Sequence, residues 1–204
     1  NCPKQFNLIE LGAGNGEMMT IITKTFQKFP QFKNGCNLKI LEKSKYLRKI
    51  QKKTINNSKV KWIDDLRELN HLPCIFIANE FFDALPIKQF IKKKSRWYER
   101  YVKFVNPIKS EYLDIPFDIK KIEKKIKFKI SLKQNFIEYS PLAMEYLKNI
   151  TSKINLNNGG ILIIDYGYLD KEMRNTIHAV SKHKYTNVLN SFRNSDITYN
   201  LSFN

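Results

Sequence analysis

The sequence has few cysteines and histidines and no long apolar stretch, and each scarcity excludes a class of protein. Cys2, Cys36 and Cys74 form no C-x-x-C pair and are too few for a disulfide scaffold, so we expect a reducing compartment. No apolar run approaches the roughly 18 residues of a membrane helix, and no signal-peptide pattern is present at the N-terminus. His178 and His183 do not share a helical face, so we predict no metal site.

Acidic residues are also scarce, with 19 Asp and Glu against 36 Lys and Arg and a net charge of +17. Such a balance raises the question of nucleic acid or an anionic membrane. However, 30 of the 36 cations are Lys and only 6 are Arg, and Asn and Ile are abundant, as A/T-rich codons produce. We interpret most of the charge as solvated surface. With 42% hydrophobic residues, the chain can form one full-sized core.

Short apolar runs alternate with amphipathic stretches along the first part of the chain. The first run is followed by a glycine-rich turn and then by apolar residues at near-helical spacing over 18–26. The four runs are 6–11, 38–41, 60–63 and 74–78. Strands that alternate with helices predict βαβ units and a parallel sheet. The unbroken apolar fourth run predicts a strand covered on both faces.

The pattern changes after the fourth run. Alternating β-rich pieces over 87–105 predict an antiparallel hairpin with its turn at 92–95. The Lys-rich stretch 115–132 has no clear period, and we expect a loosely attached segment there. Residues 136–139 mark the return of regular order.

A helix and a fifth core strand are predicted after this insertion. Ser140 and Pro141 suit the N-cap and first position of a helix over 142–154, and 161–164 reads as the strand. We therefore predict a single α/β domain over 1–204, with an insertion at about 87–135 between strands 4 and 5.

Each predicted strand ends in one or two carboxylates. These are Glu10, Glu42, Asp64 with Asp65, Glu80 with Asp83, and Asp165. Each acid alone equally suits a cap of a turn or helix. Ligands of open α/β sheets bind at the carboxyl ends of the strands, so together these acids predict a site.

The turn after the first strand carries Gly12, Ala13, Gly14 and Gly16. Glycines permit positive φ and close approach of a ligand, and the following helix begins with free N–H groups. A dinucleotide fingerprint requires Gly or Ala where Glu17 stands, and no Gly-Lys-Ser/Thr follows as in a P-loop. The turn therefore disfavours both NAD and a nucleotide triphosphate.

Glu42 follows the second predicted strand, where the acid that binds ribose hydroxyls stands in nucleoside-binding folds. A ligand with an adenosine end but no pyrophosphate explains Glu42 and the glycine turn together. S-adenosyl-L-methionine is the obvious candidate.

The fourth strand is followed by N-E-F-F-D-A-L-P at 79–86, rather than by the N-P-P-Y of many base and glutamine N-methyltransferases. Carboxylates beside aromatic rings suit a cationic acceptor such as guanidinium, which pairs with acids and stacks on rings. Phe81 and Phe82 can alternatively be core residues, and Asp83 can cap a turn.

Motifs over nearly the whole chain resemble the MidA-type family of S-adenosyl-L-methionine-dependent methyltransferases, which includes a mitochondrial complex I assembly factor that methylates arginine. The most specific are N-E-F-F-D-A-L-P at 79–86 and D-Y-G-Y at 165–168. The others lie at 7–16, 41–51, 97–102, 137–143, 159–164 and 195–203.

The resemblance implies a class I methyltransferase fold, a Rossmann-like parallel sheet with helices on both faces. It implies residues for the cofactor: Glu10, Gly12, Ala13, Gly14 and Gly16 at the methionine part, Glu42 at the ribose, Asp64 or Asp65 near the adenine, and Asn79. It implies residues for chemistry and the acceptor: Asn79, Glu80 and Asp83 as catalytic groups, with Phe82, Asp165 and Tyr166 in the substrate pocket. Asp196 and Thr198 match a family motif to which we assign no role.

The resemblance further implies arginine methylation on a partner protein, with a respiratory complex I subunit as a possible acceptor and the bacterial cytoplasm or mitochondrial matrix as the compartment. In the family, further segments flank the matched region on both sides.

Two alternatives remain open from the sequence. One is a non-catalytic assembly factor that keeps the fold and the cofactor. The other is nucleic-acid methylation, suggested by the charge and by Trp97, Tyr98 and Tyr101 but disfavoured by the missing N-P-P-Y.

Overall fold

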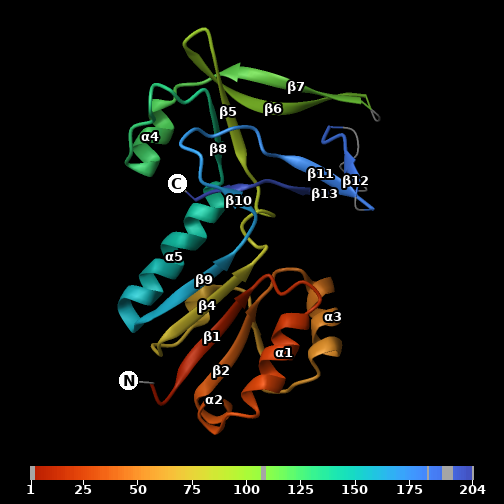
Figure 1. Cartoon of the computed structure of the whole chain (residues 1–204), viewed down its shortest axis with the longest axis vertical. Helices are drawn as coiled ribbons and strands as arrows, with labels where there is room; N and C mark the ends of the chain where they lie inside the picture. Colours follow the sequence, from red (N-terminus) through yellow and green to blue (C-terminus); the bar gives the residue numbers. More distant parts are fainter. Residues whose placement is uncertain (1–2, 107–108, 183, 190–194, 204) are drawn as a thin grey trace. The chain divides into compact units, whose positions relative to one another are not determined.

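The computed structural model forms two units (Figure 1). The residues that it describes are 3–106, 109–182, 184–189 and 195–203. The first unit contains 1–81 and 144–165, and the second contains 82–143 and 166–204. Cys2 and His183, which entered the sequence predictions, lie outside the described residues.

The first unit is built on a five-stranded sheet in the order β3-β2-β1-β4-β9, and every neighbouring pair is parallel. The strands are β1 (Phe6–Leu11), β2 (Cys36–Leu41), β3 (Lys61–Ile63), β4 (Cys74–Asn79) and β9 (Gly159–Ile164). The connecting segments contain α1 (Glu17–Phe26), α2 (Pro30–Gly35), α3 (Lys45–Ile55) and the 3₁₀ helix η1 (Leu66–Glu68). The predicted βαβ succession and parallel sheet are confirmed.

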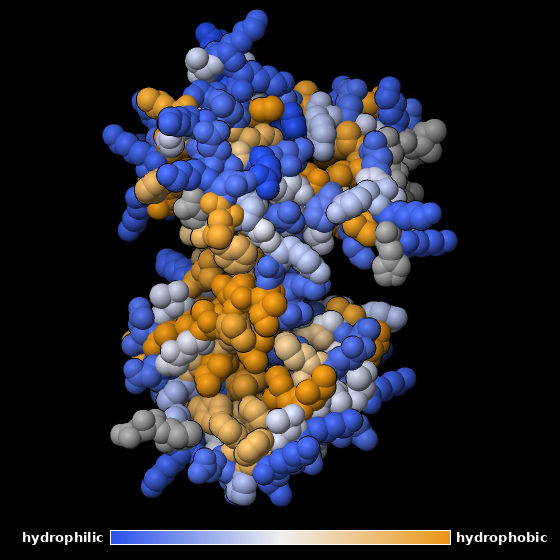
Figure 2. All heavy atoms as spheres, viewed as in Figure 1, coloured by the Kyte–Doolittle hydropathy of each residue, from blue (hydrophilic) through white to orange (hydrophobic). Residues whose placement is uncertain are grey.

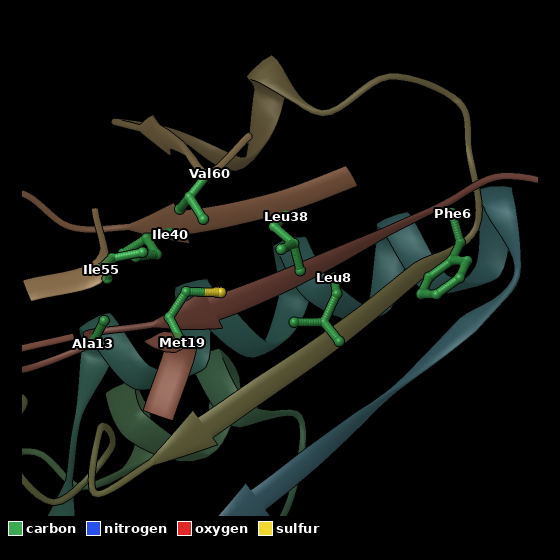
Figure 3. Close-up of a cluster of buried hydrophobic side chains, with 8 residues drawn as sticks. All are labelled: Phe6, Leu8, Ala13, Met19, Leu38, Ile40, Ile55 and Val60. Atoms are coloured by element: carbon green, nitrogen blue, oxygen red, sulfur yellow. The ribbon is translucent and has the colours of Figure 1, made fainter. Parts of the chain in front are cut away.

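The core of this unit forms where α1 and α3 pack on the central strands. Met19 of α1 and Ile55 of α3 meet Leu8 of β1 and the β2 side chains Leu38 and Ile40, all at most 7% exposed (Figure 3). Burial of each such aliphatic side chain contributes about 1.5–3 kcal/mol. This packing holds the carboxyl ends of β1 and β2 in fixed register.

One face of β4 and β9 remains exposed in the described part of the first unit. Phe76 is fully buried, but its neighbour Ile75 is 41% exposed, and Leu162 and Ile164 of β9 are about half exposed. Figure 2 shows the resulting apolar surface over these strands. The prediction that the fourth strand is covered on both faces was therefore wrong for part of the strand. On this face Ile77 packs against the cluster that contains Met19 and Ile55, whereas Ile75 is exposed.

The second unit contains an antiparallel sheet in the order β7-β6-β5-β8. Its strands are β5 (Lys88–Lys93), β6 (Arg96–Asn106), β7 (Lys109–Pro116) and β8 (Phe136–Tyr139). The predicted hairpin is confirmed, but its turn is only Lys94 and Ser95, both with positive φ. Lys92 and Lys93 extend β5, because they pair with β6.

Residues 115–132 are not loosely attached throughout, contrary to expectation, because several of their apolar side chains pack on the core of the second unit. They contain α4 (Lys120–Ile126), whose Ile122 packs with Phe90 and Ile137 in the core of the second unit. Ile119, Ile122 and Ile126 recur at helical spacing and belong to this core, but they stand among lysines over only two turns, so the period was not recognised.

The helix predicted over 142–154 is α5 (Pro141–Asn157), and Ser140 caps it as expected. Its Oγ accepts a hydrogen bond from the N–H of Ala143 at 3.1 Å. The chain then turns through Asn158 and Gly159, at φ of 62° and 139°. A Cβ on Gly159 would lie 1.9 Å from the carbonyl oxygen of Cys74, so only glycine fits at the start of β9.

The remainder of the second unit is made of short strands in two small sheets. These are β10 (Gly167–Tyr168) with β14 (Leu201–Ser202), and β11 (His178–Ser181) with β12 (Lys184–Thr186) and β13 (Asp196–Thr198).

Candidate functional site

The glycine turn between β1 and α1 has the backbone conformation that the sequence predicted. Gly12, Gly14 and Gly16 all have positive φ, at 64°, 50° and 87°. A Cβ on Gly12 would lie 2.8 Å from the ring of Phe81, whereas a Cβ on Gly14 would meet nothing within 4 Å. The space beside Gly14 is therefore open to a ligand, and Gly12 is held close to the segment after β4.

A cavity of about 530 Å³ opens beside this turn, within the 300–1,000 Å³ usual for small-molecule sites. Of the predicted residues, Glu10, Gly12, Ala13, Gly14, Asn79 and Glu80 line it. The other lining residues are Asn15, Glu17, Met18, Ile21 and Ile22. The lining thus combines acids at strand ends with an apolar wall from α1, which the sequence reading did not assign to the site.

Glu10 is the most unusual group of the cavity. Its side chain is 2% exposed, and burial raises the pKa of its carboxyl to about 7. In the part of the chain that the structure describes, its Oε2 atom has no hydrogen-bond partner. A buried carboxylate oxygen with unused acceptor capacity calls for a ligand that brings N–H donors.

Glu42 stands at the end of β2 and is 8% exposed. Its Oε1 accepts from the N–H of Ser44 at 2.8 Å, and its Oε2 accepts from the side-chain amide of Gln51 at 3.0 Å. A carboxylate has about four lone-pair positions, so one position on each oxygen is left for further donors. Two adjacent hydroxyl groups of a ligand could donate to these two unused positions of the Glu42 carboxylate.

Asp64 and Asp65 follow β3, and both carboxylates already have cationic partners. Asp64 pairs with Arg48 at 2.7 Å, and Arg48 also donates to the carbonyl oxygens of Glu42 and Ile63. Asp65 caps η1, and hydrogen bonds from Arg67 hold its carboxyl pKa at about 2. Arg48 thus ties the ends of β2 and β3 together. The adenine role of either acid stays a prediction.

Asn79 and Glu80 stand where β4 ends. Glu80 has φ of 47°, in the left-handed region that side-chain-bearing residues rarely occupy. Its N–H donates to the carbonyl oxygen of Ile164 at 2.9 Å, so β9 holds this conformation. Strained backbone conformations concentrate at functional sites. The conformation of Glu80 therefore adds support to its prediction as a catalytic residue, which rested on its sequence position alone.

The other predicted pocket residues are distributed over both units. Asp165 ends the first unit, whereas Phe82, Asp83 and Tyr166 belong to the second. Phe82 and Asp83 are buried, and the carbonyl oxygen of Phe82 accepts from the hydroxyl of Tyr199 at 2.8 Å. Tyr166 is exposed. The predicted roles of these four residues at the acceptor stay predictions.

The family motif around Asp196 and Thr198 forms β13. The hydroxyl of Thr198 lies 3.0 Å from Nε2 of His178 on the neighbouring strand β11, so this threonine joins two strands of the second unit. Among the residues that the structure describes, no group of three or more potential metal ligands occurs. No helix there is long and apolar enough to cross a membrane.

A family model described as "Putative S-adenosyl-L-methionine-dependent methyltransferase" matches residues 1–204. Among curated proteins, the chain is 24% identical to the Xenopus tropicalis protein arginine methyltransferase NDUFAF7, mitochondrial, over 99% of this chain and 52% of the relative. It is 25% identical to the Homo sapiens protein of the same name, over 97% of this chain and 50% of the relative. The chain therefore spans about half the length of the curated relatives it matches.

Among solved structures, the fold is similar to that of a Burkholderia thailandensis protein bound to S-adenosyl-homocysteine. The TM-score is 0.75 at 18% identity, over 98% of this chain and 53% of the other. Together with the β3-β2-β1-β4-β9 sheet, this similarity confirms the predicted class I methyltransferase fold.

Proposed function

The chain belongs to this family of S-adenosyl-L-methionine-dependent methyltransferases, and from that premise we propose that it binds S-adenosyl-L-methionine beside the glycine turn and methylates arginine on a partner protein. When bound, this cofactor supplies a methyl group on a cationic sulfur, so the donor is already activated. The chain must align the acceptor nitrogen with the methyl group of the cofactor and accept the proton that the acceptor releases.

Glu10 is the observation that carries the proposal. Its buried Oε2 lacks a partner in the described chain, and the cavity beside it can hold a small ligand. The α-ammonium group of the cofactor's methionine part is a cationic donor that satisfies this oxygen. The open side of Gly14 admits the same part of the cofactor close to the backbone.

Glu42 supports the adenosine end of the proposal. One lone-pair position on each of its oxygens is unused by Ser44 and Gln51, so the carboxylate can accept from both ribose hydroxyls. S-adenosyl-L-methionine carries donors for both Glu10 and Glu42, an ammonium group and a ribose, whereas a free amino acid or a nucleoside carries only one of the two.

Glu80 is our candidate for the acceptor chemistry. A guanidinium has a pKa above about 12 and is a poor nucleophile while its charge is delocalised. The carboxylate of Glu80, at the rim of the same cavity, holds the positive charge on one nitrogen, leaves another nucleophilic and accepts the released proton. Asn79 lines the cavity next to it and contributes an amide for orientation.

The names of the curated relatives support the acceptor class and the compartment. These relatives are named as mitochondrial protein arginine methyltransferases. We therefore propose that this chain also methylates arginine on a protein and that it acts in the mitochondrial matrix. A respiratory complex I subunit is the partner that the family resemblance suggests.

Calorimetric titration with S-adenosyl-homocysteine tests the cofactor proposal. We expect 1:1 binding by the unmodified chain and a loss of at least about tenfold in affinity for Glu10→Gln, which removes a charge-assisted hydrogen bond. Glu17→Gln is the matched control, because Glu17 lines the same cavity but is exposed. No binding by a folded sample, or equal losses in both variants, overturns the proposal.

The acceptor role of Glu80 has a separate test. In single-turnover transfer from methyl-labelled cofactor to an arginine-containing acceptor, Glu80→Gln should slow the reaction by about 10²-fold or more. Its affinity for S-adenosyl-homocysteine should stay within threefold or so of the unmodified value, because Glu80 is not assigned to the cofactor. Full single-turnover activity of the variant contradicts the role.

A further inference from the structure

Gln51 of α3 is a fully buried polar side chain. Its hydrogen bonds connect it to two predicted cofactor-binding residues and to a neighbouring strand of the sheet. Its Nε2 donates to the carbonyl oxygen of Gly14 at 2.9 Å and to Oε2 of Glu42 at 3.0 Å. Its Oε1 accepts from the indole Nε1 of Trp62 at 2.8 Å. One amide thus joins the glycine turn, the end of β2 and the strand β3.

The amide can take only one orientation here. The indole N–H of Trp62 is a donor with no acceptor capacity, so the amide oxygen must face it. The carbonyl of Gly14 and the carboxylate of Glu42 accept these hydrogen bonds, so both amide hydrogens must face them. Glutamine supplies two donors and one acceptor at this reach, whereas glutamate lacks the donors and asparagine is one methylene shorter.

These bonds act on two features that the proposed cofactor needs. One is the peptide of Gly14, which lines the cavity, and the other is the carboxylate of Glu42, which follows β2 and is not among the residues that line the cavity. In a trans peptide the C=O and the following N–H point in opposite directions, so holding the Gly14 carbonyl toward α3 turns the Asn15 N–H away from α3. At Glu42, the same amide occupies one position on Oε2 and fixes the rotation of the carboxylate. Both features determine where hydrogen-bonding groups stand for a ligand.

We propose that Gln51 is a positioning residue for the cofactor site, holding the Gly14 peptide and the Glu42 carboxylate at a fixed separation before the ligand arrives. This inference rests on the proposed function. A buried network whose hydrogen bonds are all made orients the ligand-binding groups before the ligand binds. Loss of the network therefore raises the dissociation constant for the ligand.

The test is calorimetric titration with S-adenosyl-homocysteine of three variants. Gln51→Leu removes both donations, and Trp62→Phe is the matched control, because it removes only the bond on the far side of the amide. The double variant Gln51→Leu/Trp62→Phe also removes the indole N–H that the single variant leaves without its acceptor. We expect at least tenfold weaker binding for Gln51→Leu and the double variant, roughly the loss of one charge-assisted bond, and less than threefold for Trp62→Phe.

A purely structural role for Gln51 predicts a different result. The thermal midpoint would fall in the variants, but the dissociation constant of the folded fraction would stay within threefold of the unmodified value, which overturns the inference. A positioning role also predicts coupling with Glu42: the combined loss in Gln51→Leu/Glu42→Ala should be smaller than the product of the single losses. Multiplicative losses contradict it.

The unmodified chain provides a test that requires no variant. In a ¹H–¹⁵N correlation spectrum, saturation with S-adenosyl-homocysteine should shift the side-chain amide signals of Gln51 and the indole signal of Trp62. Binding without any shift of the Gln51 amide overturns the inference alone. Absence of binding overturns the proposed function, and the inference falls with it.

Discussion

The backbone N–H of Glu80 donates to the carbonyl oxygen of Ile164 over 2.9 Å, which joins the backbone after β4 to the last residue of β9. The bond holds Glu80 at φ of 47°, where a side chain costs about 1–2 kcal/mol. The sheet therefore supports an unfavourable conformation at Glu80, the residue that we propose for the acceptor chemistry.

Replacing this residue by glycine separates function from stability. Glu80→Gly relieves the strain while adding an entropic cost of about 0.5–1 kcal/mol, so we expect the free energy of unfolding to change by less than about 1 kcal/mol. Methyl transfer should be lost in the same variant. Urea unfolding measures the first quantity, and a destabilisation above about 2 kcal/mol would show that the carboxylate is there for folding.

Glu10 predicts a pH dependence of ligand binding. Burial raises its pKa from 4.5 to about 7, so the free protein holds a proton there that an ammonium ligand must displace. Affinity for S-adenosyl-homocysteine should therefore rise between pH 5.5 and 7.5, by up to about tenfold per unit below the pKa, with proton release on binding. Glu10→Gln should flatten this profile, and an equally steep profile in the variant assigns the effect to another group.

The same pKa shift predicts the stability of the free protein. A carboxyl whose pKa is raised in the folded state favours folding fully below pH 4.5, and this contribution is lost as pH rises through 7. Glu10→Gln should thus raise the thermal midpoint relative to the unmodified chain at pH 8 but change it less at pH 4. Differential scanning calorimetry at both values measures the sign. A larger gain at the acidic pH would contradict this assignment.

Two glycines with equally open surroundings provide a matched comparison. A Cβ on Gly14 or on Gly160 meets nothing within 4 Å, but only Gly14 has positive φ and lines the cavity. Gly14→Ala should abolish detectable binding of S-adenosyl-homocysteine, whereas Gly160→Ala should retain it. Equal affinity in the two variants, measured by calorimetry, would remove the glycine turn from the site.

The uneven coverage of β4 gives a stability prediction. Phe76→Ala should cost about 3–5 kcal/mol because the ring is fully buried. Ile75→Ala, on the exposed face of the same strand, should cost less than about 1 kcal/mol. Chemical denaturation compares the two, and a similar cost at both positions would show that the exposed face is covered in solution.

The sequence predicted the parallel sheet and the glycine turn because both depend on local signals. Glycine spacing fixes the turn at Gly12 and Gly14, and apolar runs fix the strands. The helix α4 escaped prediction because it is short and Lys-rich, although Ile119, Ile122 and Ile126 recur at helical spacing and belong to the core of the second unit. The face that leaves Ile75 exposed depends on which neighbours pack there, which no local pattern contains.

Gln51 shows how far a sequence reading of the site can reach. It stands four residues from Leu47 and from Ile55, on the helical face where apolar residues are expected, and a polar residue at such a position signals a buried network. Its partners, however, come from three other segments, at Gly14, Glu42 and Trp62, so only the tertiary structure identifies them.

A crystal structure of the chain with S-adenosyl-homocysteine tests the central claim most directly. We predict that the ligand's ammonium group lies within hydrogen-bond distance of the Glu10 carboxylate and that its ribose hydroxyls donate to Glu42. A ligand bound away from the glycine turn, or with its ribose distant from Glu42, would contradict the account.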